Sequence, residues 1–209
     1  MQPLTSARLS NKMSTDRADL DTLLGETFLA HIAFADDEGL PRSMPTAVAR
    51  WGERLLTHGS TGSRWLRMIG DGREVCVSLA QVDGLVVART TFESSVHYRS
   101  ATILGSFTPV GAGDKAAALE VLTDRLIPGR NAEVRASSAK ELAATTIYSM
   151  DLDHWSVRIS DGWPEDTDAD VAGQAWAGVI RFGTPAYRIE AAPDLREGIE
   201  MPASVKAFV

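Results

Sequence analysis

Residues 27–57 read TFLAHIAFADDEGLPRSMPTAVARWGERLLT and carry the strongest fold signal in the chain. From Thr27 to Ala35, apolar side chains alternate with smaller or polar ones, which is the period of a half-buried strand. An acidic turn over 36–39 separates this run from a second extended run over 41–51, and a further turn leads into a third run over 54–57. Together the three runs predict an antiparallel meander.

A small polar loop follows the meander directly. Residues 58–64 read His-Gly-Ser-Thr-Gly-Ser-Arg and open a short predicted helix over 65–69. Glycines let a ligand approach the backbone closely, and the unpaired amides of a helix N-terminus favour an anion. The hydroxyls of Ser60, Thr61 and Ser63 add donors, and Arg64 adds a charged fork. The loop therefore predicts a site for one phosphate group, with a solvated helix cap as the alternative. It lacks the Gly-Lys-Ser/Thr ending of a P-loop, so it does not identify the ligand.

The rest of the chain repeats the strand-and-turn pattern. Asp83-Gly84 lies between apolar runs over 74–82 and 85–92, which predicts a tight hairpin. Helices are expected over 115–127 and 139–144, the second with a capping box at Ser138 and Glu141. Further strands are expected over 98–110, 146–151, 155–159 and 176–182.

This order predicts the fold class. Regular helices do not separate the strands, so a doubly wound parallel sheet is excluded. We expect a mainly β protein with helices (α+β): an antiparallel, closed or partly closed barrel with helices outside. A length of 209 residues fits a single domain. We place this domain at 13–182, between a flexible N-terminal extension over 1–12 and a C-terminal tail over 183–209.

Composition narrows the function classes. The chain has 28 acidic and 21 basic residues, a net charge of −7, and one cysteine, Cys76. This balance disfavours nucleic acid and anionic membranes as partners, because phosphate backbones need basic patches. No disulfide can form within the chain, the four histidines show no metal-binding spacing, and no signal peptide or membrane span is evident. We therefore expect a cytoplasmic protein without a metal site built from side chains.

Several segments together resemble the pyridoxamine 5′-phosphate oxidase-like family. The chain is similar to its flavin-nucleotide-binding branch, which is related to the nitroimidazole-resistance reductases. The segments that carry the resemblance occur in one order, and they are Leu56–Arg64, Val75–Leu79, Asp83–Val86, Tyr98–Ser100, Pro128–Arg130 and Trp176–Val179.

The resemblance implies an FMN-binding split β-barrel that forms a homodimer, with FMN held at the dimer interface. It implies that Ser63 and Arg64 bind the flavin phosphate, that the second strand of the meander lines the flavin ring, and that positions near Trp176 and Tyr98 approach the ring or ribityl chain. The cofactor-binding residues expected from the loop and the resemblance together are Thr46, Ala47, Val48, Ala49, Arg50, His58, Gly59, Ser60, Ser63, Arg64, Tyr98, Arg99, Ser100 and Trp176.

One departure from the family pattern limits the predicted activity. Pyridoxamine phosphate oxidases carry an Arg-x-His pair after the late Trp-x-Gly, whereas this chain continues Val-Ile-Arg-Phe-Gly after Trp176-Ala177-Gly178. We therefore do not predict vitamin B6 oxidation.

The resulting prediction is an FMN-dependent oxidoreductase that uses a small-molecule electron donor and acceptor, with no catalytic residue identified. The alternatives are a flavin-storing or regulatory module without turnover and a relative that uses deazaflavin or haem. The role of His58 stays open between a donor to the phosphate or ribityl chain and a solvent-facing strand end.

Overall fold

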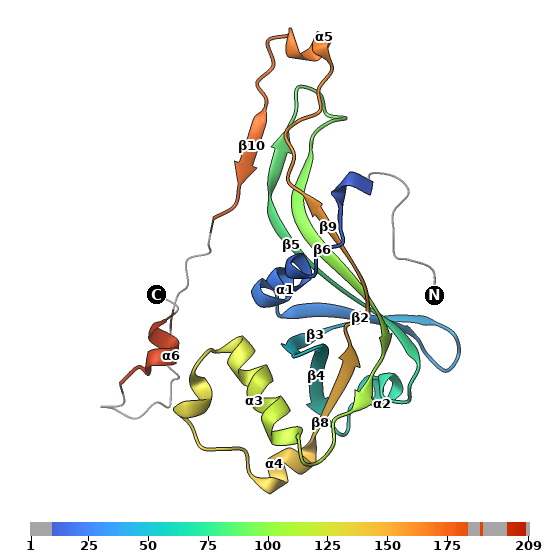
Figure 1. Ribbon diagram of the computed structural model, residues 1–209, viewed down its shortest axis with the longest axis vertical. Helices are drawn as coiled ribbons and strands as arrows, with labels where there is room; N and C mark the ends of the chain where they lie inside the picture. Colours follow the sequence, from blue (N-terminus) through green and yellow to red (C-terminus); the bar gives the residue numbers. More distant parts are fainter. Residues whose placement is uncertain (1–9, 184–188, 190–199, 208–209) are drawn as a thin grey trace.

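The protein is described by a computed structural model over residues 10–183, 189 and 200–207. Ten strands form one antiparallel sheet in the order β1-β9-β6-β5-β2-β3-β4-β8-β7, with β10 paired to β5, and the sheet does not close on itself (Figure 1). This is the split-barrel fold, in a single domain, as predicted. The strands are β1 (Met13–Ser14), β2 (Leu29–Ala35), β3 (Pro41–Trp51), β4 (Arg54–Ser60), β5 (Glu74–Val87), β6 (Ser95–Ser106), β7 (Thr108–Pro109), β8 (Thr145–Asp151), β9 (His154–Ser160) and β10 (Gly178–Arg181).

Helix α1 packs into the inside of this sheet, and α3 covers its outer face. The predicted helices over 115–127 and 139–144 are both present, and the second has the expected capping box between Ser138 and Glu141. No described helix combines the length and apolar character needed to cross a bilayer. The helices are α1 (Arg17–Glu26), α2 (Arg64–Ile69), α3 (Lys115–Leu126), α4 (Ala139–Ala144), α5 (Asp168–Val171) and α6 (Ala203–Lys206), with 3-10 turns η1 (Ser10–Lys12) and η2 (Arg130–Ala132).

Strand β3 belongs to two half-sheets. Its first part, Pro41–Ala47, pairs with β2, and its second part, Val48–Trp51, pairs with β4. The sheet therefore turns a corner between Ala47 and Val48. We call the region around this point the β3 corner.

Two apolar clusters hold the halves together. The larger one fills the inside of the sheet, where α1 contributes the buried side chains of Leu20, Leu23 and Leu24. A smaller cluster lies under α3, where Ala118 and Leu122 pack against the outer face of β3, β4 and β8. Removing this apolar surface from water stabilises both faces of the β3 corner.

The tight hairpin predicted at Asp83-Gly84 is wrong. Strand β5 continues through this dipeptide with a bulge between Val82 and Gly84, and the chain reverses only between Val87 and Ser95. Strands β5 and β6 therefore extend as a long two-stranded arm, joined by β10, with α5 near its tip (Figure 1). We use the name "the arm" for the part of β5 and β6 between Val82 and Tyr98, together with β10.

Steric crowding by β10 explains why this dipeptide contains a glycine. A Cβ atom at Gly84 would lie 2.3 Å from the backbone oxygen of Ile180 in β10. The Asp83 carbonyl accepts a hydrogen bond from the Phe182 amide at 2.9 Å. Asp83-Gly84 thus allows a third strand to dock on the arm, and no turn forms there.

This contact predicts the effect of a small substitution. Gly84→Ala should push β10 off β5 and cost about 1–3 kcal/mol, the usual range for overpacking. Hydrogen exchange should show faster exchange at the amides of β10. The matched control is Gly25→Ala in α1, where no atom lies within 4 Å of the added methyl group. Unchanged protection of β10 in Gly84→Ala would contradict this account of the bulge.

Candidate functional site

The first group of predicted site residues gathers at the β3 corner. Val48 of β3 pairs with Thr57 of β4, and the Thr57 hydroxyl donates to the Ala47 carbonyl at 3.1 Å. His58 and Gly59 follow along β4 and pair with β8. A Cβ atom at Gly59 would lie 2.3 Å from the Leu66 side chain, so the glycine lets α2 pack closely on the strand. The corner therefore brings together the predicted residues of β3, β4 and the start of α2.

The loop that sequence predicts over 58–64 is shorter in the structure. Strand β4 runs to Ser60 and α2 starts at Arg64, so only Thr61–Ser63 connect them. The three linking amides are already used: Thr61 donates to the Ala144 carbonyl, Gly62 to the Ser60 hydroxyl, and Ser63 to the Ser60 carbonyl. A phosphate on this loop would not find a free glycine-rich backbone.

Other donors of the same segment stay free. The Ser63 hydroxyl makes no capping hydrogen bond to α2. Arg64 is exposed and forms no ion pair within the described part of the chain, whereas Arg50 is paired with Asp21 and Glu53. An Arg fork with its donors free is the side chain best suited to a phosphate. Ser63 and Arg64 are therefore two side chains of this segment whose donor groups are free for an anion.

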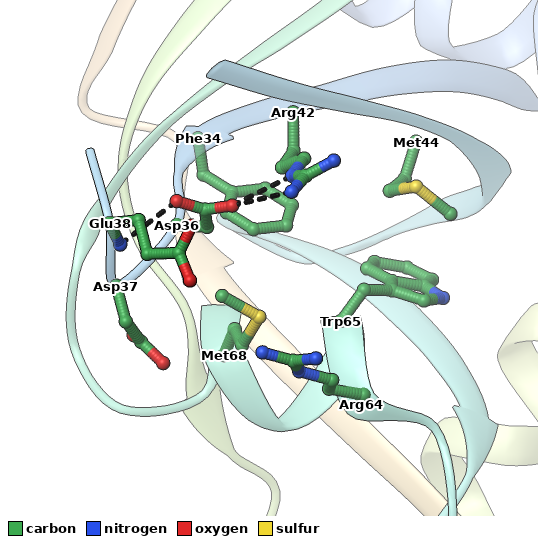
Figure 2. Close-up of a pocket in the computed structure, with 9 residues that line it drawn as sticks. All are labelled: Phe34, Asp36, Asp37, Glu38, Arg42, Met44, Arg64, Trp65 and Met68. Atoms are coloured by element: carbon green, nitrogen blue, oxygen red, sulfur yellow. Dashed lines mark hydrogen bonds and ion pairs between the residues drawn. The ribbon is translucent and has the colours of Figure 1, made fainter. Parts of the chain in front are cut away.

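Arg64 also lines a pocket of about 450 Å³ between α2 and the turn that joins β2 to β3. In Figure 2, Arg64, Trp65 and Met68 reach it from α2, and the remaining side chains come from the β2–β3 hairpin. The hairpin residues that line it are Phe34, Asp36, Asp37, Glu38, Arg42 and Met44.

No pattern in the sequence predicts this pocket. The hairpin reads as an ordinary acidic turn, and Trp65 reads as a packing residue. Only tertiary packing brings the turn against α2. We call this cavity the hairpin pocket.

Nearby arginines neutralise two of the three carboxylates of the hairpin pocket. Asp36 accepts backbone hydrogen bonds from Leu40 and Glu38 and pairs with Arg42 at 2.8 Å, and these contacts lower the pKa of the Asp36 carboxyl. Asp37 pairs with Arg73 at 2.8 Å. Neither Glu38 nor Arg64 forms an ion pair in the described residues. The pocket thus offers one free carboxylate and one free guanidinium.

His58 is the histidine at the β3 corner, and like His97 it keeps a buried ring nitrogen without a partner. It is half-buried, its Nδ1 atom is buried without a hydrogen-bond partner, and burial lowers the pKa of its imidazole below the ordinary value of 6.5. His31 and His154 are exposed. His97 is 1% exposed, and its Nε2 lies 2.7 Å from the Gly162 carbonyl. Near neutral pH, His58 is therefore a neutral imidazole with an unused ring nitrogen at the edge of the β3 corner.

The second group of predicted residues lies on or near the arm. Arg99 of β6 forms a two-bond pair with Asp83, at 2.8 and 2.7 Å, and also pairs with Glu26 at the end of α1. These contacts raise the pKa of Arg99 and tie the base of the arm to α1. Tyr98 and Ser100 flank Arg99 on β6, and Trp176 precedes β10 with its side chain 68% exposed.

The two groups lie on different strands of the sheet. Strands β5 and β2 lie between β6 and β3 in the sheet, so three steps of about 4.8 Å put β6 about 14 Å from β3 along the sheet. The predicted residues of one chain thus form two groups along the sheet, at the β3 corner and on the arm, and we call these groups half-sites.

Comparison with known proteins establishes the family. The family model described as pyridoxamine 5′-phosphate oxidase matches residues 16–159. The chain therefore belongs to this family of flavin-binding split-barrel proteins, which confirms the resemblance found in the sequence. A search of the curated proteins finds no match.

Solved structures place the chain more closely within the family. The FAD and heme binding protein from Mycobacterium smegmatis is 46% identical, with 94% of this chain and 97% of that chain covered and a TM-score of 0.91. The flavocytochrome Anf3 from Azotobacter vinelandii is 29% identical, with coverage of 98% and 95% and a TM-score of 0.89. A candidate 5-nitroimidazole antibiotic resistance protein from Bacteroides thetaiotaomicron, 14% identical with coverage of 70% and 86% and a TM-score of 0.59, shares the fold.

The burial of His58 predicts a pH dependence of stability. Below about pH 6.5 the unfolded chain protonates this imidazole while the folded chain keeps it neutral. The unfolded state then binds more protons, so the free energy of unfolding falls as the pH falls. Denaturant unfolding of the cofactor-free protein from about pH 7 to about pH 5 should show a smaller loss for His58→Gln than for the wild type. His31→Gln, at an exposed position, is the control and should follow the wild type. Equal losses in His58→Gln and the wild type would mean that His58 is solvated.

Proposed function

We propose that the protein binds a flavin nucleotide at the β3 corner and acts as a flavin-dependent oxidoreductase on a small substrate. The observation that carries this proposal is the free Arg64 guanidinium beside the unused Ser63 hydroxyl, at the end of β4 in a flavin-binding fold. In a chain with a net charge of −7, such a site attracts an anion only through local donors. FMN and FAD share the phosphate nearest the ring, so the same two residues serve either flavin.

The backbone of β3 supplies the second part of the proposed site. Thr46 and Ala47 are half-buried beside His58, while Val48 and Ala49 are buried and hold the strand against both apolar clusters. Half-buried backbone next to the phosphate donors suits the polar edge of a flavin ring. When bound, the flavin supplies hydride and single-electron chemistry, and the protein's part is to hold, orient and shield it.

We also propose haem as a second cofactor, with His58 as its iron ligand. The relative that is 46% identical is an FAD and heme binding protein, and the relative that is 29% identical is a flavocytochrome. A haem ligand needs a neutral imidazole with a ring nitrogen that iron can reach. Burial lowers the pKa of the half-buried His58 imidazole, and because its Nδ1 is buried, its Nε2 is the nitrogen that would face the iron. When bound, haem would add one-electron chemistry.

The working unit in this proposal is a homodimer. Proteins of this family are commonly dimers. On the arm, Leu85 pairs with Val96 on one side and with Ile180 on the other. These three apolar side chains form a row across three strands and are 39%, 37% and 48% exposed. Covering this row with a second copy would bring the arm's half-site, which includes Tyr98 and Trp176, toward the partner's β3 corner.

A spectrum with a reduction experiment tests the cofactors and the reaction. The purified wild-type protein should show both flavin and Soret bands, and anaerobic mixing with NADH or NADPH should bleach the flavin band. His58→Ala should lose the Soret band and keep the flavin band. If His58→Ala keeps the Soret band but binds flavin more weakly, His58 is a donor to the flavin. If dithionite reduces the flavin but no nicotinamide donor does, the protein is a flavin-binding module without turnover.

Light scattering tests the dimer. The wild type should have a mass of about twice 22.5 kDa. Leu85→Asp should shift it toward the monomer and weaken flavin binding, because a charge in the apolar row would lose its water on association. Val134→Asp, at an exposed apolar position away from the arm, is the matched control. A monomer that holds stoichiometric flavin would rule out a site shared between two copies.

A further inference from the structure

We propose that a pocket beside α3 binds a small neutral α-amino acid as its zwitterion, with Arg125 as the partner of the ligand's carboxylate. The inference goes beyond the proposed function and uses neither Ser63 nor Arg64. The pocket has a volume of about 460 Å³, and its walls come from residues 117–125 of α3, from Arg50 of β3 and from Asn131 of η2. We call this cavity the α3 pocket.

The guanidinium of Arg125 is held in place but not neutralised. Its Nε donates to the Leu24 carbonyl at the end of α1 at 3.1 Å, and the group lies 5.7 Å from the centre of the Phe28 ring. Within the described ranges it forms no ion pair, and its Nη2 is buried without a hydrogen-bond partner. Burial lowers the pKa of Arg125, because the charged form loses water. A partly buried cation of this kind costs stability, and a ligand carboxylate would offset the cost.

The other arginine of the α3 pocket is already paired. Arg50 lies 2.8 Å from Asp21 and 3.3 Å from Glu53, and its Nε donates to the Gly52 carbonyl at 2.9 Å. The carboxylate of a ligand therefore has Arg125 as its partner. In Figure 1, α3 lies below α1 and beside β3 and β4, so the pocket borders the β3 corner.

Two carboxylates line the same pocket without pairing with this cation. Glu120 and Asp124 lie one turn apart on α3, and both are exposed. Asp124 accepts a hydrogen bond from the Gly129 amide at 2.8 Å, and the Asn131 side chain donates to the Glu120 carbonyl at 2.8 Å, which fixes η2 against α3. Neither carboxylate forms an ion pair with Arg125. Opposite charges that line one cavity and stay apart suit a ligand that carries both charges.

The rest of the wall defines the class of amino acid. Ala117 and Val121 contribute small apolar side chains to the pocket. Because Arg50 is neutralised, the pocket has no second free cation for an acidic side chain, and the two carboxylates are matched by the ligand's ammonium group. A cavity of about 460 Å³ has the size of a small-molecule site. An amino acid with an aliphatic side chain therefore fits best.

Three probes of similar shape test this inference on the full-length protein, by calorimetry and by ligand-detected NMR. L-Leucine carries both charges, isocaproate lacks the ammonium group, and isoamylamine lacks the carboxylate. The wild type should bind L-leucine most tightly and isocaproate several-fold more weakly. Isoamylamine should show no measurable binding, because its cation would meet Arg125 without a carboxylate.

Variants assign the two charges of the ligand to their partners. Arg125→Met should weaken L-leucine and isocaproate at least about tenfold, because charge-assisted hydrogen bonds are lost. Glu120→Gln should weaken L-leucine several-fold and strengthen isocaproate, because a carboxylate that repels the anion is removed. Arg130→Met is the matched control: this arginine lies outside the pocket, pairs with Glu133 at 3.2 Å, and should leave all affinities unchanged.

Glu120→Gln also covers the risk that Arg125→Met fails to fold, since that variant loses the hydrogen bond to the Leu24 carbonyl. Thermal unfolding gives a second measurement on the folded variants. Saturating L-leucine should raise the Tm of the wild type and of Arg130→Met, because a ligand that binds only the folded state stabilises it. It should not raise the Tm of Arg125→Met.

The contrary outcomes separate this inference from the flavin proposal. Failure of the wild type to bind L-leucine, or equal L-leucine affinity in the wild type and Arg125→Met, would overturn the α3 pocket as a ligand site. Tighter binding of isocaproate than of L-leucine would overturn the zwitterion. Arg64→Ala should weaken flavin binding and leave the L-leucine affinity unchanged. Loss of L-leucine binding in Arg64→Ala but not in Arg125→Met would move the ligand to the hairpin pocket and overturn this inference.

Discussion

Strand β3 has to satisfy two half-sheets at once, and the candidate site depends on this constraint. Its first seven residues are hydrogen-bonded to β2 and its last four to β4, so the backbone must change direction between Ala47 and Val48. An apolar cluster on each side prevents the strand from shifting. Register in a half-buried strand is strongly specified, because a slip of one residue would turn every apolar side chain to the wrong face. The backbone beside His58 and Arg64 is held rigidly for this reason.

Two polar side chains of the candidate site have groups without partners in this rigid frame. Most arginines in the structure are neutralised: Arg50 by Asp21 and Glu53, Arg99 by Asp83 and Glu26. Arg64 is left free, and His58 keeps a buried nitrogen without a partner. A buried polar atom without a partner costs stability, so its presence in a well-packed corner points to a ligand that completes it. Arg17, Thr27, His97, Arg125 and Arg158 also keep such an atom among the described residues, so it is the place of His58 at the β3 corner, and not its lone nitrogen by itself, that connects it with the candidate site.

The arm poses a different physical problem. A two-stranded ribbon has little core of its own, and β10 adds a third strand only because Gly84 leaves space for the Ile180 carbonyl. The apolar row through Leu85 stays exposed on a single chain, and the ion pairs of Arg99 hold only the base of the arm. An arm of this kind gains most from a second surface to lie against.

The sequence by itself determined most of the strands, the main helices and the family, because each of these depends on local periodicity, capping or an ordered set of short motifs; its assignment of Ser63 and Arg64 to a phosphate stays a prediction. It misread Asp83-Gly84 as a turn, since the strand that docks there comes almost 100 residues later. It also described a free glycine-rich loop where the tertiary structure extends β4 and uses the linking amides. The hairpin pocket and the separation of β6 from β3 were decided only by the tertiary structure. Both depend on which distant segments pack together, and long-range packing leaves no local pattern in the chain.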